Sequence, residues 1–270
     1  MKRSWSWLLV LCLVALPVFA LAQNAAEVTE GDLKVDHGQV NWTERTIVAT
    51  GSGAPDLKAA NVAVARLGAE RVAKLDALRN IMEALKGVRV SSEVTVENEM
   101  VTNSKMRTKV EGVARRFKVL RTKYYSDGGV DLVVQMSLDG PLASTLLKTG
   151  EAPTAAEAPN SGVIIDARGL KAMPALAPRL LDEGGGVLYS SEALSKEALE
   201  ANGVVGYFKD FDAAKKNERV GAKPLTVKAL KLADDSKTDV VLSNVDAEKL
   251  KAAGGTPKFL TQGHVIIVID

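Results

Sequence analysis

The stretch from Asp56 to Leu85 constrains the fold more than any other part of the sequence. Its apolar side chains recur at steps of three and four residues, no proline interrupts it, and Gly87 follows as a stop signal. This spacing predicts one long amphipathic helix with Asp56 as its N-cap. The positions that define its apolar face are Val62, Ala65, Ala69, Val72, Ala73, Met82 and Leu85. Because this face is rich in alanine, another layer of the protein can approach the helix closely.

Strand patterns lie on both sides of this helix. Strands are predicted at residues 46–50, 88–96, 114–125 and 129–138. The glycine-rich run 51–55 ends the first of them, and Asp127-Gly128-Gly129 joins the last two as a hairpin. Residues 98–112 are either an excursion or an irregular extension of a strand, and residues 142–147 suggest a short helix. One long helix packed on an antiparallel sheet satisfies this pattern, so the fold class is α+β.

The second half of the chain predicts a second, small α/β domain. The Ala-, Pro- and Glu-rich run 150–161 is typical of a linker, although a surface loop within one domain is the alternative. Beyond it, fully apolar strands such as residues 264–269 alternate with short helical stretches, which favours a sheet covered on both faces. The predicted organisation is a signal peptide 1–22, an N-terminal tail 23–44, an α+β domain 45–149, a linker 150–161 and an α/β domain 162–270.

The first 22 residues have the pattern of a cleavable secretory signal peptide. Lys2 and Arg3 precede an apolar run, and Ala20-Leu21-Ala22 offers a cleavage site. The alternative is an uncleaved membrane anchor, but the run is close to the minimum length for a span. Cys12 follows Leu11 inside the apolar run, so we interpret it as part of that run rather than as a lipidation site. We expect an exported, periplasmic protein, peripheral to the outer membrane at most, with no membrane span after cleavage.

Charge and composition argue against nucleic acid as a partner. The chain carries a formal charge of +2, and removal of Lys2 and Arg3 leaves it neutral. A neutral surface has no general attraction to a phosphate backbone, and aromatic residues make up only 4% of the sequence, which disfavours base stacking. Cys12 is the only cysteine, so the exported part has no disulfide.

The sequence contains no combination of residues that predicts catalysis. Its two histidines, His37 and His264, fall in different predicted units, and a zinc site needs three or four ligands. The segment 163–169 resembles the end of a strand in zinc-dependent cell-wall amidases. In those enzymes Gly and a metal-binding His follow the Ile-Asp-Ala sequence, whereas Arg168 and Gly169 follow it here. We therefore expect no metal and no cofactor. Asp166 and Arg168 remain as candidates for a ligand site, with Asp166 expected to pair locally with Arg168 or Arg179.

Residues from about 45 to 140 resemble a known family. The residues concerned are AVARLGAERVAKLDALRN at 63–80, IMEALKGV at 81–88, Ser91-Ser92, FKVL at 117–120, YYSDGGV at 124–130 and LVVQM at 132–136. They resemble the N-terminal domain of flagellar assembly protein T and the related Lpp-twenty lipoprotein family. The resemblance implies a structural protein of the periplasm or outer membrane, with flagellar or other envelope proteins as partners, and supplies no catalytic residues.

These observations lead to two hypotheses of different kinds. The first is a non-enzymatic, exported protein of the cell envelope that acts as a structural or assembly factor through protein–protein contact, including contact with its own copies. The second is a periplasmic small-ligand-binding protein or enzyme with its site near Asp166 in the second domain, because ligands favour strand ends in α/β sheets.

Overall fold

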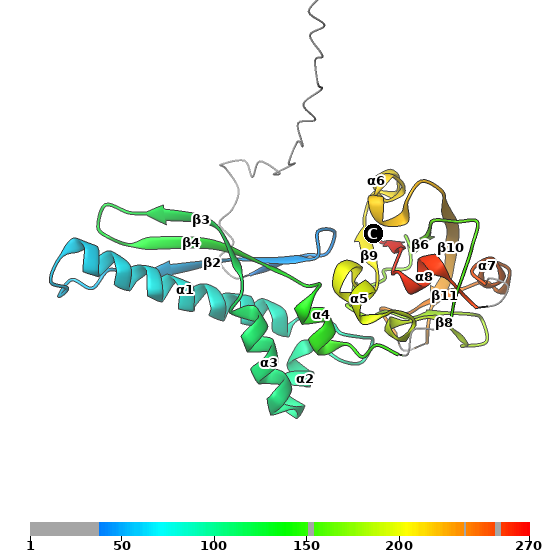
Figure 1. Ribbon diagram of the computed structural model, residues 1–270, viewed down its shortest axis with the longest axis horizontal. Helices are drawn as coiled ribbons and strands as arrows, with labels where there is room; N and C mark the ends of the chain where they lie inside the picture. The colour runs from blue at the N-terminus through cyan, green and yellow to red at the C-terminus, as the bar shows by residue number, and fades with distance from the viewer. Residues whose placement is uncertain (1–37, 151–153, 235, 252–254) are drawn as a thin grey trace, which may run out of the picture. The chain divides into compact units, whose positions relative to one another are not determined.

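The computed structural model describes residues 38–150, 154–234, 236–251 and 255–270 of the 270-residue chain (Figure 1). The predicted signal peptide 1–22 and the first part of the predicted tail, residues 23–37, lie outside the described residues. Helices and sheets are both present, with an antiparallel sheet in the N-terminal part and a mixed sheet further along the chain. The α+β prediction is therefore confirmed.

Residues 38–138 contain a four-stranded antiparallel sheet with one long helix on it. The strand order is β1 (Gln39–Asn41), β2 (Thr46–Gly53), β4 (Val130–Ser137) and β3 (Lys118–Tyr124). Helix α1 (Val62–Lys86) lies along β2 and β4 (Figure 1). The predicted hairpin between β3 and β4 is confirmed, with Gly128 at φ 93° and the Tyr125 amide donating to the Gly129 carbonyl.

The alanines of α1 allow β2 to lie almost in backbone contact with the helix. Ala69, Ala73 and Ala77 are fully buried against the strand. A Cβ atom placed on Gly51 or Gly53 would overlap the backbone of these same turns of the helix. The sequence pattern predicts that these glycines end the strand after Thr50, but the strand continues through them. Only glycine fits where strand and helix approach this closely.

The structure corrects two local predictions around α1. Its N-cap is Asn61, whose side chain accepts a hydrogen bond from the Val64 amide, and not Asp56, which accepts from the Lys58 amide in a preceding turn. Two residues predicted on the buried face, Val62 and Val72, are 68% and 50% exposed.

The strand predicted at residues 88–96 is wrong. That segment forms a single bridge between Arg89 and Thr95, and the chain then enters α2 (Val96–Thr102) and α3 (Ser104–Ala114). Thr95 caps α2 by accepting from the Asn98 amide, and acidic residues occupy the first turn, so a helix start lies inside the alternating pattern. The carbonyls of Arg89 and Val90 accept instead from the amides of residues 176 and 177.

Residues 141–270 begin with α4 (Pro141–Leu146), which confirms the short predicted helix, and continue into a seven-stranded sheet. The strand order is β8 (Val187–Tyr189), β7 (Leu180–Leu181), β11 (Val240–Leu242), β10 (Pro224–Leu232), β6 (Gly162–Asp166), β13 (Val265–Val268) and β9 (Gly206–Phe208). Strands β10, β6, β13 and β9 run parallel, while β8 and β11 pair antiparallel with β7 and β10.

Short helices connect these strands. They are α5 (Lys196–Asn202), α6 (Phe211–Lys216), α7 (Asn244–Lys249), α8 (Lys258–Thr261) and the 3₁₀ turns Ser191–Ala193 and Glu218–Val220. A further parallel pair joins β5 (Ala155–Ala156) and β12 (Thr256–Pro257), so part of the predicted linker is paired. The domain boundaries drawn at this linker stay a prediction.

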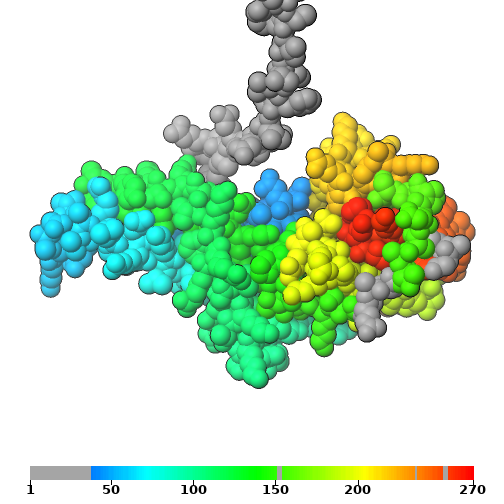
Figure 2. Space-filling view, viewed as in Figure 1, coloured from blue at the N-terminus to red at the C-terminus, as the bar shows by residue number. Residues whose placement is uncertain are grey.

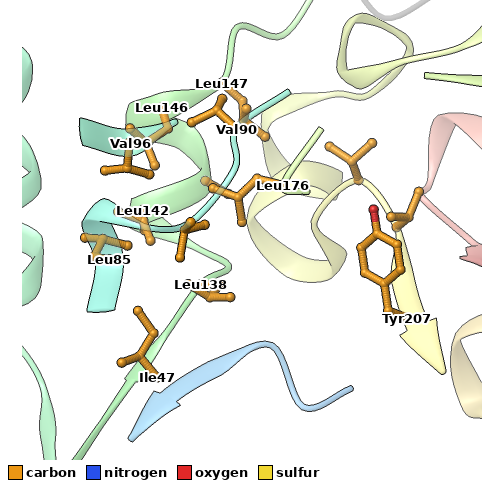
Figure 3. Packing of buried hydrophobic residues seen from close by; sticks show 14 of the residues in the cluster. Ile47, Leu85, Val90, Val96, Leu138, Leu142, Leu146, Leu147, Leu176 and Tyr207 are labelled. Carbon is orange, nitrogen blue, oxygen red and sulfur yellow. The ribbon is translucent and has the colours of Figure 1, made fainter. Parts of the chain in front are cut away.

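One cluster of buried apolar side chains runs from the N-terminal sheet into the seven-stranded sheet. Figure 3 shows Ile47, Leu85, Leu138 and Leu142 together with Leu176 and Tyr207 from the later part of the chain. The ring of Trp42 meets the ring of Tyr207 edge to face, with centroids 5.7 Å apart. Buried Arg45 links the same parts, because it pairs with Asp139 and donates to the Val205 carbonyl.

Candidate functional site

The predicted ligand-site residues Asp166 and Arg168 form a local ion pair. Asp166 stands at the carboxyl end of β6 and accepts hydrogen bonds from Nε and Nη2 of Arg168 at 2.8 and 2.7 Å, and from its amide at 3.2 Å. The Arg168 hydrogen bond holds the pKa of the Asp166 carboxyl below its usual value. The guanidinium of Arg168 also lies 5.5 Å from the ring centre of Phe211. Both charges thus have partners within the chain.

Asp270 occupies the neighbouring strand end. Its carboxylate accepts hydrogen bonds from the amides of Gly169 and Lys171, at 2.7 and 3.1 Å. The loop after β6 is therefore tied to the end of the last strand by these contacts. Neither Asp166 nor Arg168 lines any of the four pockets described in the protein. The second interpretation of the sequence, a ligand site at Asp166, gains no support from this arrangement.

A polar pocket of about 570 Å³ lies at the opposite, amino-terminal ends of the parallel strands. His264 lines it, with Nδ1 3.1 Å from the Ser161 carbonyl oxygen, and so do Arg45, Asp139 and Arg219. Sequence reasoning missed both arginines, because their partners are 160 and 44 residues away along the chain.

Several donors of these arginines are directed at the protein itself. Arg219 donates from Nε to the Gly263 carbonyl at 2.8 Å and from Nη2 to the Gly203 carbonyl at 3.2 Å. Burial lowers the pKa of Arg219 to about 10, with Arg45 adding to the effect, so Arg219 remains charged at neutral pH. Within the described residues no three His, Cys, Asp or Glu side chains lie close enough to hold a metal ion. The arginines that line the pocket thus hold neighbouring loops together through these hydrogen bonds.

The largest of the described pockets is a groove between α1, α2 and α3, with a volume of about 680 Å³ and a lining of both apolar and charged side chains. Its apolar lining consists of Leu75, Leu78, Met82, Met100 and Val101. Charged side chains also line the groove: Arg79, Glu83, Lys86, Glu97, Arg107, Glu111 and Arg115. A groove lined by both apolar and charged side chains can receive an amphipathic helix. We call this feature the α1–α3 groove.

The α1–α3 groove continues as an exposed apolar stripe along α1. The stripe consists of exposed Val64, Leu67 and Leu75 and of partly buried Leu78 and Met82, on the side away from the sheet, and exposed Arg71 interrupts it between Leu67 and Leu75. Leu75 is 65% exposed, and Val101 at the groove edge is 80% exposed. Figure 2 shows α1, in cyan, on the surface of the molecule, where it meets the green surface of the residues that follow it. Sequence reasoning did not separate this face from the alanine face, and it assigned Met82 to the latter.

None of the helices in the described part of the chain combines the length and apolar character needed to cross a bilayer. The predicted leader lies outside the described residues.

Comparison with known proteins gives one family match, over the C-terminal part of the chain. The model of the family described as Treponema pallidum Tp0624, second domain, matches residues 162–270. The match covers less than half of the chain and begins at the first residue of β6. A search of curated proteins found no match to the chain.

This match corrects the family resemblance drawn from the sequence. The family found is that of the Tp0624 second domain and not that of flagellar assembly protein T or Lpp-twenty. The physical reason lies in the residues used. An alanine-rich helix followed by strands and an Asp-Gly hairpin is what close strand-on-helix packing demands, and such packing is not restricted to one family. The close contact between α1 and β2 therefore explains the alanine-rich helix on which the resemblance was based.

Proposed function

We propose that this protein is an exported, non-enzymatic component of the cell envelope that acts as a structural or assembly factor through protein–protein contact. The observation that carries the proposal is the set of exposed apolar side chains on α1 together with the α1–α3 groove. Monomeric soluble proteins rarely leave an apolar patch of more than a few hundred Å² open to water. A patch with a charged rim is typical of a surface that binds another protein.

The leader sequence supports the compartment in this proposal. Lys2, Arg3, the apolar run and Ala20-Leu21-Ala22 have the order that export requires. The arrangement of polar side chains supports a non-enzymatic role, because Asp166, Arg168, Arg45 and Arg219 all bond within the chain. No contact in the described part of the chain favours the alternative, a ligand site or enzyme centred on Asp166.

Export is tested by following the chain in its own host with an antibody against it. We expect the processed chain in the periplasmic or envelope fraction. Leu9→Arg, which interrupts the apolar run, should leave the unprocessed chain inside the cell. Cys12→Ser is the matched control and should be exported like the unaltered chain, because Cys12 is interpreted as an apolar residue of the leader. An unaltered chain that stays unprocessed in the cytoplasm contradicts the proposal.

Contact with other proteins is tested by cross-linking in living cells, followed by capture of the chain and identification of what is attached. We expect envelope proteins in the captured material, and a defect in envelope integrity in a strain that lacks the gene. Capture of the chain without any envelope protein, together with a normal envelope in the deletion strain, contradicts the proposed role.

A further inference from the structure

We propose that the polar pocket at the amino-terminal ends of the parallel strands binds a small molecule through an oxyanion group, a carboxylate or a phosphate, and that Arg219 holds this group. The pocket has a volume of about 570 Å³ and is lined by residues from both the early and the late part of the described chain. The inference goes beyond the proposed function and does not depend on it, because no residue of α1 is among those that line this pocket.

The charges that line the pocket do not balance. Three side chains are positive, Arg45, Lys216 and Arg219, and two are negative, Asp139 and Glu218, with the histidine of the pocket neutral. Lys216 and Glu218 are exposed, so water screens them. Asp139 is already paired with Arg45 through both of its carboxylate oxygens. The positive charge that lacks a carboxylate is therefore that of Arg219.

Arg219 has more hydrogen-bond donors than the protein uses. A guanidinium carries five N–H groups. Nε donates to the Gly263 carbonyl and Nη2 to the Gly203 carbonyl, and the side chain forms no other hydrogen bond within the described part of the chain. These bonds leave both N–H groups of Nη1 and one of Nη2. Two neighbouring guanidinium nitrogens with N–H groups form the fork that fits a carboxylate or a phosphate.

A glycine keeps Nη1 of Arg219 accessible. Gly206 is the first residue of β9 and lines the pocket. A Cβ atom placed on it would lie 3.6 Å from Nη1 and 3.3 Å from Cδ of Arg219, so a side chain at this position would reach across Nη1. The two carbonyl bonds meanwhile hold the guanidinium in place. Its remaining donors are thus oriented before a ligand arrives, which reduces the entropy lost on binding.

An anion at this position would relieve an electrostatic cost. A buried charge is unfavourable unless an opposite charge compensates it. Burial, together with the like charge of Arg45, lowers the pKa of Arg219 to about 10. An oxyanion beside Nη1 would supply the missing negative charge through hydrogen bonds between ionised groups, which are the strongest kind in proteins.

The rest of the lining indicates what the oxyanion is attached to. The pocket volume lies within the range of small-molecule sites, which is roughly 300–1,000 Å³. Asn202 and Asn217 offer amide groups, while Ala201 and Phe208 contribute apolar surface. This combination fits a small organic acid or phosphate ester that carries further polar groups.

Binding is tested by NMR titration of the full chain, purified in the form that accumulates. The probes are succinate, whose charged groups are carboxylates, and glycerol phosphate, each replacing chloride at constant ionic strength. The amide signal of Gly206 reports on the pocket. We expect this signal to shift and to reach saturation with at least one probe at tens of millimolar. The probe that binds more tightly identifies the oxyanion as a carboxylate or a phosphate.

Lys216→Glu tests the location of the bound charge without altering Arg219. Lys216 is an exposed residue of α6 that lines the pocket, and reversal of its charge should weaken binding about three- to tenfold. Lys215→Glu is the matched control. Lys215 is exposed on the same helix but does not line the pocket, so this variant changes the net charge equally and should bind like the unaltered chain.

Arg219→Gln removes the charge and the fork, while the glutamine amide can still donate to a neighbouring carbonyl. We expect affinity for the probe to fall at least about tenfold. A purely structural arginine gives a different result, because its loss lowers the melting temperature and leaves the affinity of the folded variant unchanged. If Arg219→Gln does not fold, the comparison of Lys216→Glu with Lys215→Glu decides.

Three results would overturn the inference. They are the lack of a saturating shift with either probe, equal affinities of Lys216→Glu and Lys215→Glu, and an unchanged affinity in folded Arg219→Gln. None of them bears on the proposed function, because export and the capture of envelope proteins are measured separately.

Discussion

For Asp166 and Arg168, the sequence predicted the contact between the two side chains but not their surroundings. They are two residues apart at a strand end, and the expectation of local pairing is confirmed by the two hydrogen bonds between their side chains. The sequence did not predict the third partner, Phe211, which is the first residue of α6 and whose ring lies beside the guanidinium. The pair is therefore explained as a structural contact at the end of β6.

The titration of Asp166 gives a prediction at this scale. Its folded-state pKa lies below the value near 3.9 of an unfolded chain, so the pair stabilises the fold above that pH. This stabilisation is lost as the pH falls through the folded-state pKa, and it is small because the pair is largely open to water. Carboxyl ¹³C shifts followed against pH should show the low value, and Arg168→Gln should raise it towards 3.9.

Asp246 provides the internal control for that titration. Its carboxyl is likewise held at a low pKa, by the hydrogen bond from Lys249. Arg168→Gln should leave the Asp246 titration unchanged. If the pKa of Asp166 is the same with and without Arg168, the assigned cause is wrong.

The N-cap of α1 gives a second prediction for single residues. Asn61→Ala removes the acceptor of the Val64 amide and should lower the free energy of unfolding by about 1 kcal/mol. Asp56→Ala should have less than about half that effect, because Asp56 only closes the turn before the helix. Urea unfolding of both variants distinguishes the two. A larger loss with Asp56→Ala would mean that the helix starts where the sequence pattern placed it.

At the scale of elements, the close contact between α1 and β2 organises the N-terminal part. The alanine face of α1 was predictable, and so was the approach of another layer to it. The continuation of β2 through Gly51 and Gly53 could not be predicted, because glycine usually weakens or ends a strand. Its role here depends on the helix that packs against it. Thr95 shows the same limit, because an alternating pattern around it concealed a helix cap.

Gly53→Ala tests this contact. The added methyl would overlap the Ala69 carbonyl, so we expect a loss of about 1–3 kcal/mol in the free energy of unfolding from forced displacement of the strand. Gly112→Ala in α3 is the matched control, because its Cβ would meet open space. That variant should be stabilised by up to about 1 kcal/mol through higher helix propensity. Equal effects of the two substitutions would contradict the close packing.

At the scale of the whole molecule, contacts distant in sequence tie the early and late parts of the described chain together. Arg45 pairs with Asp139 within the first part and reaches the Val205 carbonyl in the second. Leu176 packs in the shared apolar cluster, and its amide donates to the Arg89 carbonyl. Because of these contacts, we expect each part to contribute to the free energy of unfolding of the other.

Arg45→Met is the prediction for this scale. It leaves Asp139 without its cation and the Val205 carbonyl without its donor, so we expect a loss of about 2–4 kcal/mol in the free energy of unfolding. Arg107→Met breaks an exposed pair with Glu111 and should change stability by less than about 0.5 kcal/mol. Urea titrations followed by circular dichroism compare them. A loss with Arg45→Met as small as that with Arg107→Met would mean that Arg45 does not hold the two parts together.

The sequence by itself determined the features that depend on neighbours along the chain. These are the long helix, the β3–β4 hairpin and the Asp166–Arg168 pair. Tertiary structure decided the rest: the extension of β2 across its glycines, the helices in place of a strand after Arg89, and the two arginines whose partners lie far away in sequence. It also decided where the buried face of α1 ends: Val62 and Val72 of the predicted face remain exposed, because the sheet contacts the helix at Ala69, Ala73 and Ala77.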